Sequence, residues 1–367
     1  MGDQVFLKPR HATRQLSVGG VTIGGGAPVR VQSMTNTATA DAAATRAQIA
    51  RLADAGCELA RVAVPDAAAA AALPAILRDS PVPVIADIHF DYQLALAAID
   101  AGIHGLRLNP GNIGGAERVR AVAQRARAAG VPIRIGVNAG SLEKQLQQEI
   151  DAAPRAQHDA LLAQALVDSA LRQAALLEAE GVTQIKISLK ASSVPVTVLA
   201  YRALAARCDY PLHIGITEAG TVATGSVKSA VGLGILLSEG LGDTLRVSLS
   251  GPPEDEPVVA RQILKFLGLR TDMPEVIACP TCARTGIAVA ALARAVEEQL
   301  RGVRVPLTVA VMGCVVNGPG EARHADVGIC GGAGQGVLFR KGEIVRTMPE
   351  TELLAALAAE IERYTRP

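Results

Sequence analysis

Tryptophan is absent from this 367-residue sequence, and aromatic residues of all kinds make up only 2% of it. Single-stranded nucleic acids are held largely by stacking of their bases on aromatic rings, so the composition excludes that class of binding surface. The formal net charge of +1 gives no field that would attract a polyanionic polymer. Any anionic ligand must therefore be held by a local cluster of cationic side chains.

Long apolar runs are also missing. The most apolar region, residues 67–77, is rich in alanine, contains Pro74 and is too short to span a bilayer. The first ten residues contain no apolar run of the kind that a signal peptide needs, so we expect a cytoplasmic protein without a membrane partner. Six cysteines without a secretory signal favour reduced thiols and metal ligation over disulfides.

The sequence does contain one repeated unit, in which a short β-branched strand is followed by a polar loop and an amphipathic helix rich in alanine and leucine. Eight such units are typical of a closed (β/α)8 barrel, the TIM-like fold. Glycines such as Gly56, Gly102 and Gly130 are expected to end helices. The expected strands are residues 29–34, 58–64, 82–88, 105–108, 133–137, 184–189, 212–217 and 244–249.

The repeat ends near residue 268, and the following residues, 269–274, have the composition of a linker. We therefore expect two domains, a barrel over residues 1–268 and a smaller α+β domain over residues 269–367. The expected elements of the second domain are a strand leading into Cys279, a helix over 285–302, a strand over 307–312, two short strands around Val327 and Val337, and a helix over 350–364.

The barrel strands carry a second pattern, because successive side chains of a strand face opposite sides. One set of alternate positions is aliphatic and is expected to pack against the helices. The other set is polar and is expected to face the barrel interior and its mouth. It comprises Asp87 and His89, Arg107 and Asn109, Arg134, Gly136 and Asn138, Lys186, Ser188 and Lys190, and Arg246, Ser248 and Ser250. Burying several unpaired cations costs several kcal/mol each, so this interior predicts a bound anion.

Glu218 is a carboxylate at the end of the seventh expected strand, in an otherwise cationic mouth. It is a candidate general acid or base. Simple pairing with a neighbouring cation is the alternative interpretation.

The second domain contains a different motif, Cys279-Pro280-Thr281-Cys282, followed some thirty residues later by Cys314 in a loop rich in glycine and proline. Two cysteines separated by two residues can bind one metal from a single turn, and a third thiolate half-encloses it. The alternatives are a redox dithiol and half of a structural zinc site. A structural zinc site usually has a second compact cysteine pair, which this sequence lacks, and the glycines and prolines around Cys314 fit a tight loop around a bulky cluster, so an iron–sulfur cluster is favoured over zinc. Glu321 and Cys330 are rival candidates for the fourth ligand. Cys57 and Cys208 are expected to be core residues.

With these residues laid out, nearly the whole chain resembles the family of bacterial 4-hydroxy-3-methylbut-2-enyl diphosphate synthases, enzymes of the methylerythritol phosphate route to isoprenoids. The resemblance lies in seven stretches: Val31 to Thr37, Ala86 to Tyr92, Asn109 to Gly114, Ile135 to Glu143, Gly215 to Gly220, Cys279 to Cys282, and Gly313 to Glu321.

The resemblance implies a reductive ring opening of 2-C-methyl-D-erythritol 2,4-cyclodiphosphate, with two electrons passed singly through a [4Fe-4S] cluster. Flavodoxin or ferredoxin would be the donor, and the protein would be a homodimer. The implied cluster ligands are Cys279, Cys282, Cys314 and Glu321, so that Glu321 rather than Cys330 holds the fourth position, where a substrate oxygen could displace it. The implied diphosphate-binding residues are Arg61, Arg107, Arg134, Asn138, Lys190 and Ser248. We add Asp87 to the substrate site, and Glu218 corresponds to the acid or base.

Two other classes of function stay open at this point. One is a non-redox barrel transferase for a diphosphate-activated substrate, similar to a dihydropteroate synthase, with structural zinc in its second domain. The other is a binding protein whose cysteine domain senses iron. The identity of the bound metal distinguishes the transferase from an iron–sulfur oxidoreductase. Turnover of a substrate distinguishes the iron-sensing binding protein from that oxidoreductase.

Overall fold

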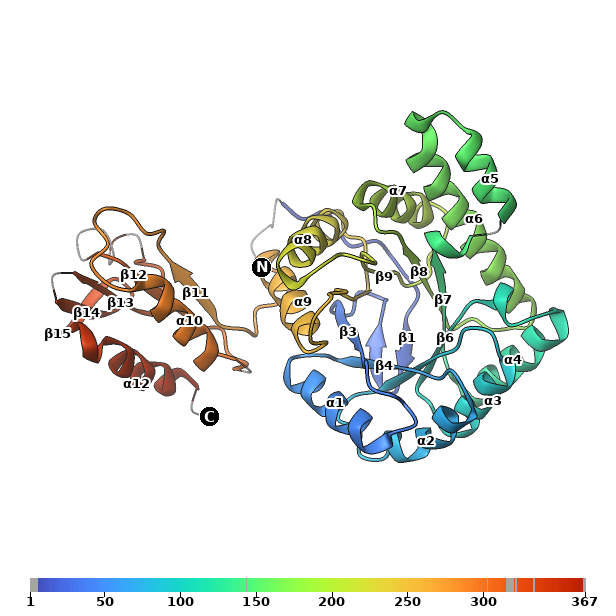
Figure 1. The fold of residues 1–367 in the computed structure, drawn as a ribbon, viewed down its shortest axis with the longest axis horizontal. Helices are drawn as coiled ribbons and strands as arrows, with labels where there is room; N and C mark the ends of the chain where they lie inside the picture. Colours follow the sequence, from blue (N-terminus) through green and yellow to red (C-terminus); the bar gives the residue numbers. More distant parts are fainter. Residues whose placement is uncertain are drawn as a thin grey trace. The chain divides into compact units, whose positions relative to one another are not determined.

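The computed structural model describes residues 6–142, 144–301, 303–314, 320, 322–332 and 334–365. The chain divides into two compact units, Met1–Leu269 and Arg270–Pro367, which we describe separately (Figure 1). The division lies within the expected linker, residues 269–274, and one residue after the expected domain boundary.

The first unit is built around eight parallel strands in the order β8-β7-β6-β5-β4-β3-β10-β9. Their bounds are β3 (Arg30–Met34), β4 (Leu59–Ala63), β5 (Val84–Asp87), β6 (Gly105–Leu108), β7 (Ile133–Asn138), β8 (Ile185–Lys190), β9 (His213–Ile214) and β10 (Thr244–Leu245). The predicted TIM-like barrel is thus confirmed, and each strand begins within two residues of its predicted start. The last two strands are much shorter than predicted. Regular pairing stops at Ile214 and Leu245, and the Arg246 amide then makes a single hydrogen bond to Ile214 O at 3.0 Å.

Helices surround these strands (Figure 1). They are α1 (Ala42–Asp54), α2 (Ala67–Leu77), α3 (Tyr92–Asp100), α4 (Ala116–Ala129), α5 (Lys144–Ala152), α6 (His158–Ala179), α7 (Val194–Ala205), α8 (Val222–Ser238) and α9 (Asp255–Phe266), with short 3-10 turns η1 (Pro110–Asn112), η2 (Ala139–Ser141) and η3 (Arg155–Gln157). Asp41, Asp66 and Asp91 cap α1, α2 and α3 by accepting hydrogen bonds from backbone N–H groups of the first turn. Gly130 ends α4 in the left-handed conformation that glycine adopts without strain.

The barrel closes between β8 and β9 with little regular pairing. The Ile187 amide donates to Pro211 O at 3.0 Å, and an isolated bridge joins Ile187 to Leu212. The hydroxyl of the fully buried Tyr201, on α7, spans the same seam by accepting from the Leu189 amide and donating to His213 O. Backbone groups that the short strands leave unpaired are therefore satisfied by a side chain.

A hairpin of β1 (Leu16–Val18) and β2 (Val21–Ile23) precedes the barrel and was not among the predicted strands. It was missed because each strand is only three residues long and gives no clear alternation. Leu16, Val18 and Ile23 pack against Leu59 and Ile85 in a separate apolar cluster. Since Leu59 and Ile85 lie in the first two positions of their strands, the hairpin covers the amino-terminal end of the barrel interior.

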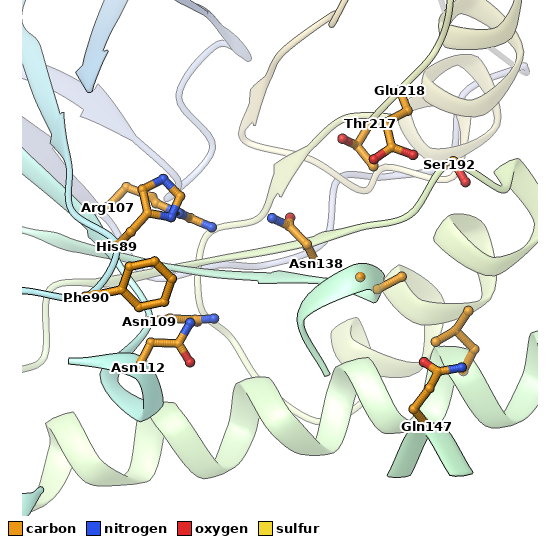
Figure 2. A pocket seen from close by; sticks show the side chains of 13 residues that line it. His89, Phe90, Arg107, Asn109, Asn112, Asn138, Gln147, Ser192, Thr217 and Glu218 are labelled. Atoms are coloured by element: carbon orange, nitrogen blue, oxygen red, sulfur yellow. Dashed lines mark hydrogen bonds between the residues drawn. The ribbon is translucent and has the colours of Figure 1, made fainter. Parts of the chain in front are cut away.

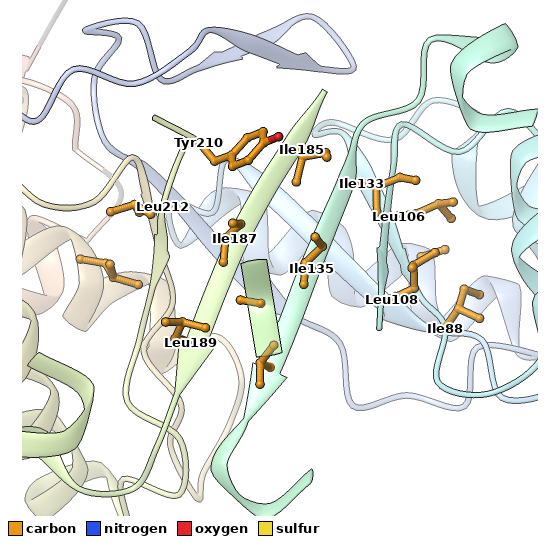
Figure 3. Close-up of a cluster of buried hydrophobic side chains, with 14 of the residues drawn as sticks. Ile88, Leu106, Leu108, Ile133, Ile135, Ile185, Ile187, Leu189, Tyr210 and Leu212 are labelled. Atoms are coloured by element: carbon orange, nitrogen blue, oxygen red, sulfur yellow. The ribbon is translucent and has the colours of Figure 1, made fainter. Parts of the chain in front are cut away.

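The outward-facing strand positions form the main core, as the alternation predicted. Leu106, Leu108, Ile133, Ile135 and Ile187 are each at most 1% exposed (Figure 3). At about 25 cal/mol per Å² of buried apolar surface, rows of such side chains supply the main stabilising term of the unit. The inward positions are left to polar side chains.

The second unit has a five-stranded sheet in the order β11-β12-β13-β14-β15, with β11, β12 and β13 parallel and the other pairs antiparallel. Its elements are β11 (Glu275–Ala278), α10 (Val289–Gln299), β12 (Thr308–Met312), β13 (Val327–Gly332), β14 (Gln335–Arg340), β15 (Glu343–Pro349), η4 (Glu350–Glu352) and α12 (Leu353–Thr365). The predicted α+β character is confirmed, but β15 was missed, because most of its residues are exposed on both faces. Helix α10 begins four residues later than predicted, since the residues before it are tied to the cysteine loops.

One stretch of the described chain, Arg155–Ala179, is long and apolar enough by length and composition to cross a membrane, and half of it is buried. It consists of η3 and α6, and α6 packs against α5, α7, β7 and β8. Packing within the barrel unit accounts for its apolar residues.

Candidate functional site

A row of charged side chains crosses four neighbouring barrel strands at one level. Strand register places Asp87 beside Arg107, Arg107 beside Arg134, and Arg134 beside Lys186. All four residues are at least 93% buried. Like charges directly opposite each other on neighbouring strands are unfavourable, so three adjacent cations need a partner that this row does not contain.

Asp87 is the anionic end of this row. Its carboxylate lies 3.1 Å from Arg107 Nη1 and 3.5 Å from Arg61 Nε, with His89 Nε2 at 3.7 Å. Burial alone would raise the pKa of Asp87, but Arg61, His89 and Arg107 outweigh it and hold that pKa well below its ordinary range. Asp87 is therefore ionised at neutral pH and orients two guanidinium groups.

Cations that do not pair with Asp87 lack partners for part of their hydrogen-bonding groups. Two nitrogens of Arg134, Nε and Nη2, have no hydrogen-bond partner among the described residues. Burial and then the charges of Arg61 and Arg107 lower the pKa of Arg134, and burial and then Arg134 lower that of Lys190. The interior is thus arranged to hold positive charge without enough negative charge to balance it, which favours an anionic ligand.

Two glycines on inward positions make room for these cations. A Cβ on Gly136 would lie 2.5 Å from Arg107 Nε, and one on Gly215 would lie 2.6 Å from Arg246 O and 3.1 Å from Lys190 Nζ. Arg107 Nη2 also donates to Gly136 O at 3.0 Å. The Arg107 side chain is therefore in close contact with β7 at Gly136.

Arg246 belongs to the same cluster, although it was not among the predicted substrate residues. Its Nε lies 3.2 Å from Glu256, a buried residue of α9 that also accepts from Ser33 Oγ at 2.8 Å. Arg246 occupies an inward position of the polar pattern, so the alternation alone could have identified it. Glu256 could not have been found in this way, because it lies on helix α9 and the alternation of strand positions says nothing about helix residues.

All seven predicted substrate residues reach a single cavity of about 240 Å³. Its lining comprises Arg61, Asp87, His89, Arg107, Arg134, Gly136, Asn138, Lys190, Thr217, Arg246 and Ser248. A larger cavity of about 540 Å³ shares His89, Arg107, Asn138 and Thr217 with it and also reaches Glu218 (Figure 2). The cation cluster therefore opens toward a wider polar chamber.

Glu218 is exposed in that wider chamber, next to Thr217 and on the opposite side from His89 and Phe90 (Figure 2). Its φ of 52° is unusual for a residue with a side chain. Backbone strain of this kind costs about 1–3 kcal/mol and tends to occur where a side chain is presented for function. No ion pair of the Glu218 carboxylate is found among the described residues, so the alternative of simple charge pairing gains no support.

In the second unit, the cysteine motif follows β11 and Cys314 follows β12. These strands are parallel neighbours, with Ala278 beside Val311, so both loops leave the same end of the sheet. Gly286 N donates to Gly313 O at 2.8 Å, which ties the two loops together. A Cβ on Gly313 would lie 3.0 Å from Thr285 and Val289, so glycine permits this close approach.

The thiols themselves have donors directed at them. Gly313 N donates to Cys279 Sγ at 3.0 Å, and hydrogen bonds from Arg284 lower the pKa of Cys282. Donors of this kind favour thiolates, which are the form that binds iron. Soft sulfur ligands on two tied loops fit an iron–sulfur cluster, although no three of the described His, Cys, Asp and Glu side chains are already close enough to hold a metal.

Of the two candidates for the fourth ligand, the structure describes Cys330. Glu321 lies outside the described residues. Cys330 is fully buried on β13, beside Met312, and burial and then Cys314 raise its pKa to about 11. A raised pKa keeps the Cys330 thiol protonated as long as no metal is bound to it. Of the other cysteines, Cys57 is buried as predicted and Cys208 is half-buried.

Fold and site together define a (β/α)8-barrel protein with a cation-lined mouth and a separate cysteine-bearing α+β unit. Residues 13–261 match the family described as the GcpE TIM-barrel domain, and residues 275–363 match the GcpE protein C-terminal domain. The chain belongs to the GcpE family.

Two relatives that align with this chain over nearly their whole length have the same name. A protein of Geobacter sulfurreducens, named 4-hydroxy-3-methylbut-2-en-1-yl diphosphate synthase (flavodoxin), is 61% identical over 96% of this chain and 97% of its own. A protein of Maridesulfovibrio salexigens with the same name is 57% identical over 97% and 98%. Among solved structures, a Yersinia pestis dihydropteroate synthase is similar over 70% of this chain and 98% of its own, with 14% identity and a TM-score of 0.47. A likeness that weak supports no statement about this chain.

We predict that Gly136→Ala weakens binding of inorganic pyrophosphate by about 1.5–3 kcal/mol, the scale of a hydrogen bond to a charged group, because the new methyl group displaces the Arg107 guanidinium. Titration calorimetry measures the affinity. Gly111→Ala is the matched control, since a Cβ there meets no atom within 4 Å. Equal affinities of Gly136→Ala and the unmodified protein would mean that the position of Arg107 does not matter for anion binding.

Proposed function

We propose that this chain catalyses the reductive ring opening of 2-C-methyl-D-erythritol 2,4-cyclodiphosphate to 4-hydroxy-3-methylbut-2-enyl diphosphate, a step in isoprenoid precursor synthesis. The reaction is that of relatives that are 61% and 57% identical over nearly the whole chain. It makes the protein an oxidoreductase. The observation that carries the assignment of the site is the surplus of cations in one barrel cavity.

That cavity is lined by five cations and a single carboxylate. The cations are Arg61, Arg107, Arg134, Lys190 and Arg246, and the carboxylate is Asp87. A cyclic diphosphate is a dianion at neutral pH, because each phosphorus keeps one strongly acidic oxygen. Guanidinium groups bind such oxygens through paired hydrogen bonds, and Arg134 has two buried nitrogens still unpartnered among the described residues. We assign the diphosphate to Arg61, Arg107, Arg134, Asn138, Lys190 and Ser248, with Asp87 fixing the first two.

The rest of the substrate would extend toward the wider chamber and Glu218. In the reaction, the bond between the tertiary carbon and its phosphate oxygen breaks, and the neighbouring hydroxyl leaves as water while two electrons form the double bond. One proton is needed for the departing water. Glu218 is proposed as the group that donates it, since it is a carboxylate presented at the mouth without an ion-pair partner among the described residues.

The electrons require a redox group, and we propose a [4Fe-4S] cluster held by Cys279, Cys282, Cys314 and Glu321. Such a cluster supplies one electron at a time at low potential. The hydrogen bonds donated to Cys279 and Cys282 suit such a cluster, because they favour the thiolate form. A carboxylate at the fourth iron would be displaced by a substrate oxygen more readily than a thiolate would.

The relatives' name specifies flavodoxin, and we propose a flavodoxin as the electron donor here, with a ferredoxin as the alternative. A homodimer and a cytoplasmic location remain predictions. A purely structural zinc site would favour a transferase instead, and metal content distinguishes the two.

The protein, purified without oxygen and supplied with dithionite and methyl viologen, should convert the cyclic diphosphate to the linear product. Phosphorus NMR measures this conversion. Arg134→Leu should keep its visible absorption but bind the substrate about 1.5–3 kcal/mol more weakly, because a charge-assisted contact is lost. Arg294→Leu, an exposed position on α10, is the control. Binding of the cyclic diphosphate without any turnover would reject the proposed reaction while leaving the anion site intact.

Glu321→Ala should bind the cluster poorly or change its spectrum, because a ligand is removed, whereas Cys330→Ala should leave iron content and spectrum unchanged. Iron and sulfide analysis with electron paramagnetic resonance of the reduced protein checks both variants. Cys330 is the matched comparison because it is the rival candidate for the fourth ligand. The reverse result would assign the fourth position to Cys330.

A further inference from the structure

Lys186 is a buried cation of the barrel interior that the proposed reaction leaves without a role. It occupies an inward position on β8, directly beside Arg134 on β7, and is 2% exposed. It is the residue of the charged row farthest from Asp87. Its amine has no hydrogen-bond partner among the described residues. A buried ammonium without any partner is costly, so the protein must gain something from this lysine.

The space next to Lys186 offers it no counter-ion. A small cavity of about 10 Å³ is lined by Arg134 and Lys186 and lies toward the end of the barrel that the β1–β2 hairpin covers. Its other lining residues are Val18, Ile85, Gly105, Leu106, Pro132 and Ile133. Space of this size holds about one water molecule. Arg134 lines both this cavity and the substrate cavity, so it separates Lys186 from the anion site.

The charged and titratable groups around Lys186 come from several strands. Arg134 on β7 and Arg61 on β4 repel a proton on its amine, and Asp243, before β10, attracts one. Asp243 is already engaged by Arg10, by Thr13 and by the Leu212 amide. His213 on β9 and Lys190 on β8 also face this interior, and burial lowers the pKa of both. Burial and then Arg134 lower the pKa of Lys186 to about 7.

We propose that Lys186 is a positioning residue that couples diphosphate binding to the uptake of one proton. In the unliganded protein near pH 8, Lys186 is mostly neutral, which relieves repulsion of Arg134. An anion bound to Arg134 reverses the local potential, and the Lys186 amine then takes a proton from solvent and becomes an ammonium. The charged lysine holds Arg134 against the ligand from behind. This inference rests on the proposed diphosphate site, but not on the redox reaction.

Proton linkage gives the sign of the expected effect. Between about pH 7 and the higher pKa of the liganded state, binding requires a proton, so affinity should fall about tenfold per pH unit as pH rises. The folded protein binds fewer protons than the unfolded chain between about pH 7 and about pH 10, so Lys186 makes stability rise with pH in that window. Below pH 7 the lysine is charged in both states and its burial is most unfavourable. Lys186→Met should therefore raise the melting temperature, most strongly at pH 7 and below.

The test is titration calorimetry of the intact protein, purified without oxygen, in buffers of different ionisation enthalpy, which counts protons taken up on binding. The ligands are the cyclic diphosphate and symmetric dimethyl diphosphate, neither of which titrates near neutral pH. Lys186→Met and Lys186→Arg are compared with Lys265→Met, a control on α9, on the outside of the barrel. The difference between the unmodified protein and Lys186→Met isolates Lys186 from Lys190 and His213.

Because Lys190 and His213 also have lowered pKa values, we expect a difference: near pH 8, the unmodified protein and Lys265→Met should take up close to one proton more on binding than either Lys186 variant. The pH dependence of the affinity should weaken correspondingly in Lys186→Arg, which stays charged. No proton uptake in the unmodified protein, or the same uptake in Lys186→Met, would overturn the inference whatever the stability of the variants. Uptake with dimethyl diphosphate but no binding of the cyclic compound would keep the inference and reject the proposed substrate.

Discussion

The structure depends on one electrostatic constraint, the burial of more positive than negative charge inside a barrel. In most (β/α)8 barrels the interior is filled by layers of aliphatic side chains. Here the middle of the barrel holds Arg61, Arg107, Arg134, Lys186 and Lys190, and Asp87 is the carboxylate among them. Such an interior is unfavourable in the absence of a ligand, because the cations repel one another. Under the proposed function, a bound dianion would remove this repulsion, and the folded protein would already hold the cations in place to bind it.

The outer face of the same strands makes this arrangement possible. Isoleucine, leucine and valine on alternate positions pack against the helices, and an apolar hairpin covers the amino-terminal end of the barrel. The stability gained there offsets the cost of the interior charges. Small residues then give the cations their directions, as Gly136 does for Arg107. The second unit follows a similar principle at smaller scale, since Gly313 lets two cysteine loops approach and directs its N–H group at a thiol.

Much of this could be predicted from the sequence, because strand alternation separates the two faces of a barrel. The aliphatic positions correctly identified the outer core. The polar positions include Arg107, Arg134, Asn138, Lys190 and Ser248, whereas Arg61 and the assignment of all six residues to a diphosphate come from the family resemblance and stay a prediction. Contacts made from helices into the barrel could not be predicted, because strand alternation does not show which helix side chains reach the strands. The Glu256 carboxylate reaches Arg246 and Ser33 from α9, and Tyr201 spans the barrel seam from α7. The hairpin and β15 were missed because short or exposed strands carry little hydrophobic periodicity. The role of Glu321 rests on family resemblance alone, since it lies outside the described residues.

The most direct test of the account is metal analysis of the protein purified without oxygen, combined with its visible spectrum before and after dithionite. The account predicts about four irons and four sulfides per chain and broad absorption near 400 nm that bleaches on reduction, as is general for such clusters. Stoichiometric zinc with no visible absorption, persisting after attempted cluster reconstitution, would contradict it. The cation-lined barrel would then serve a transferase rather than a reductase.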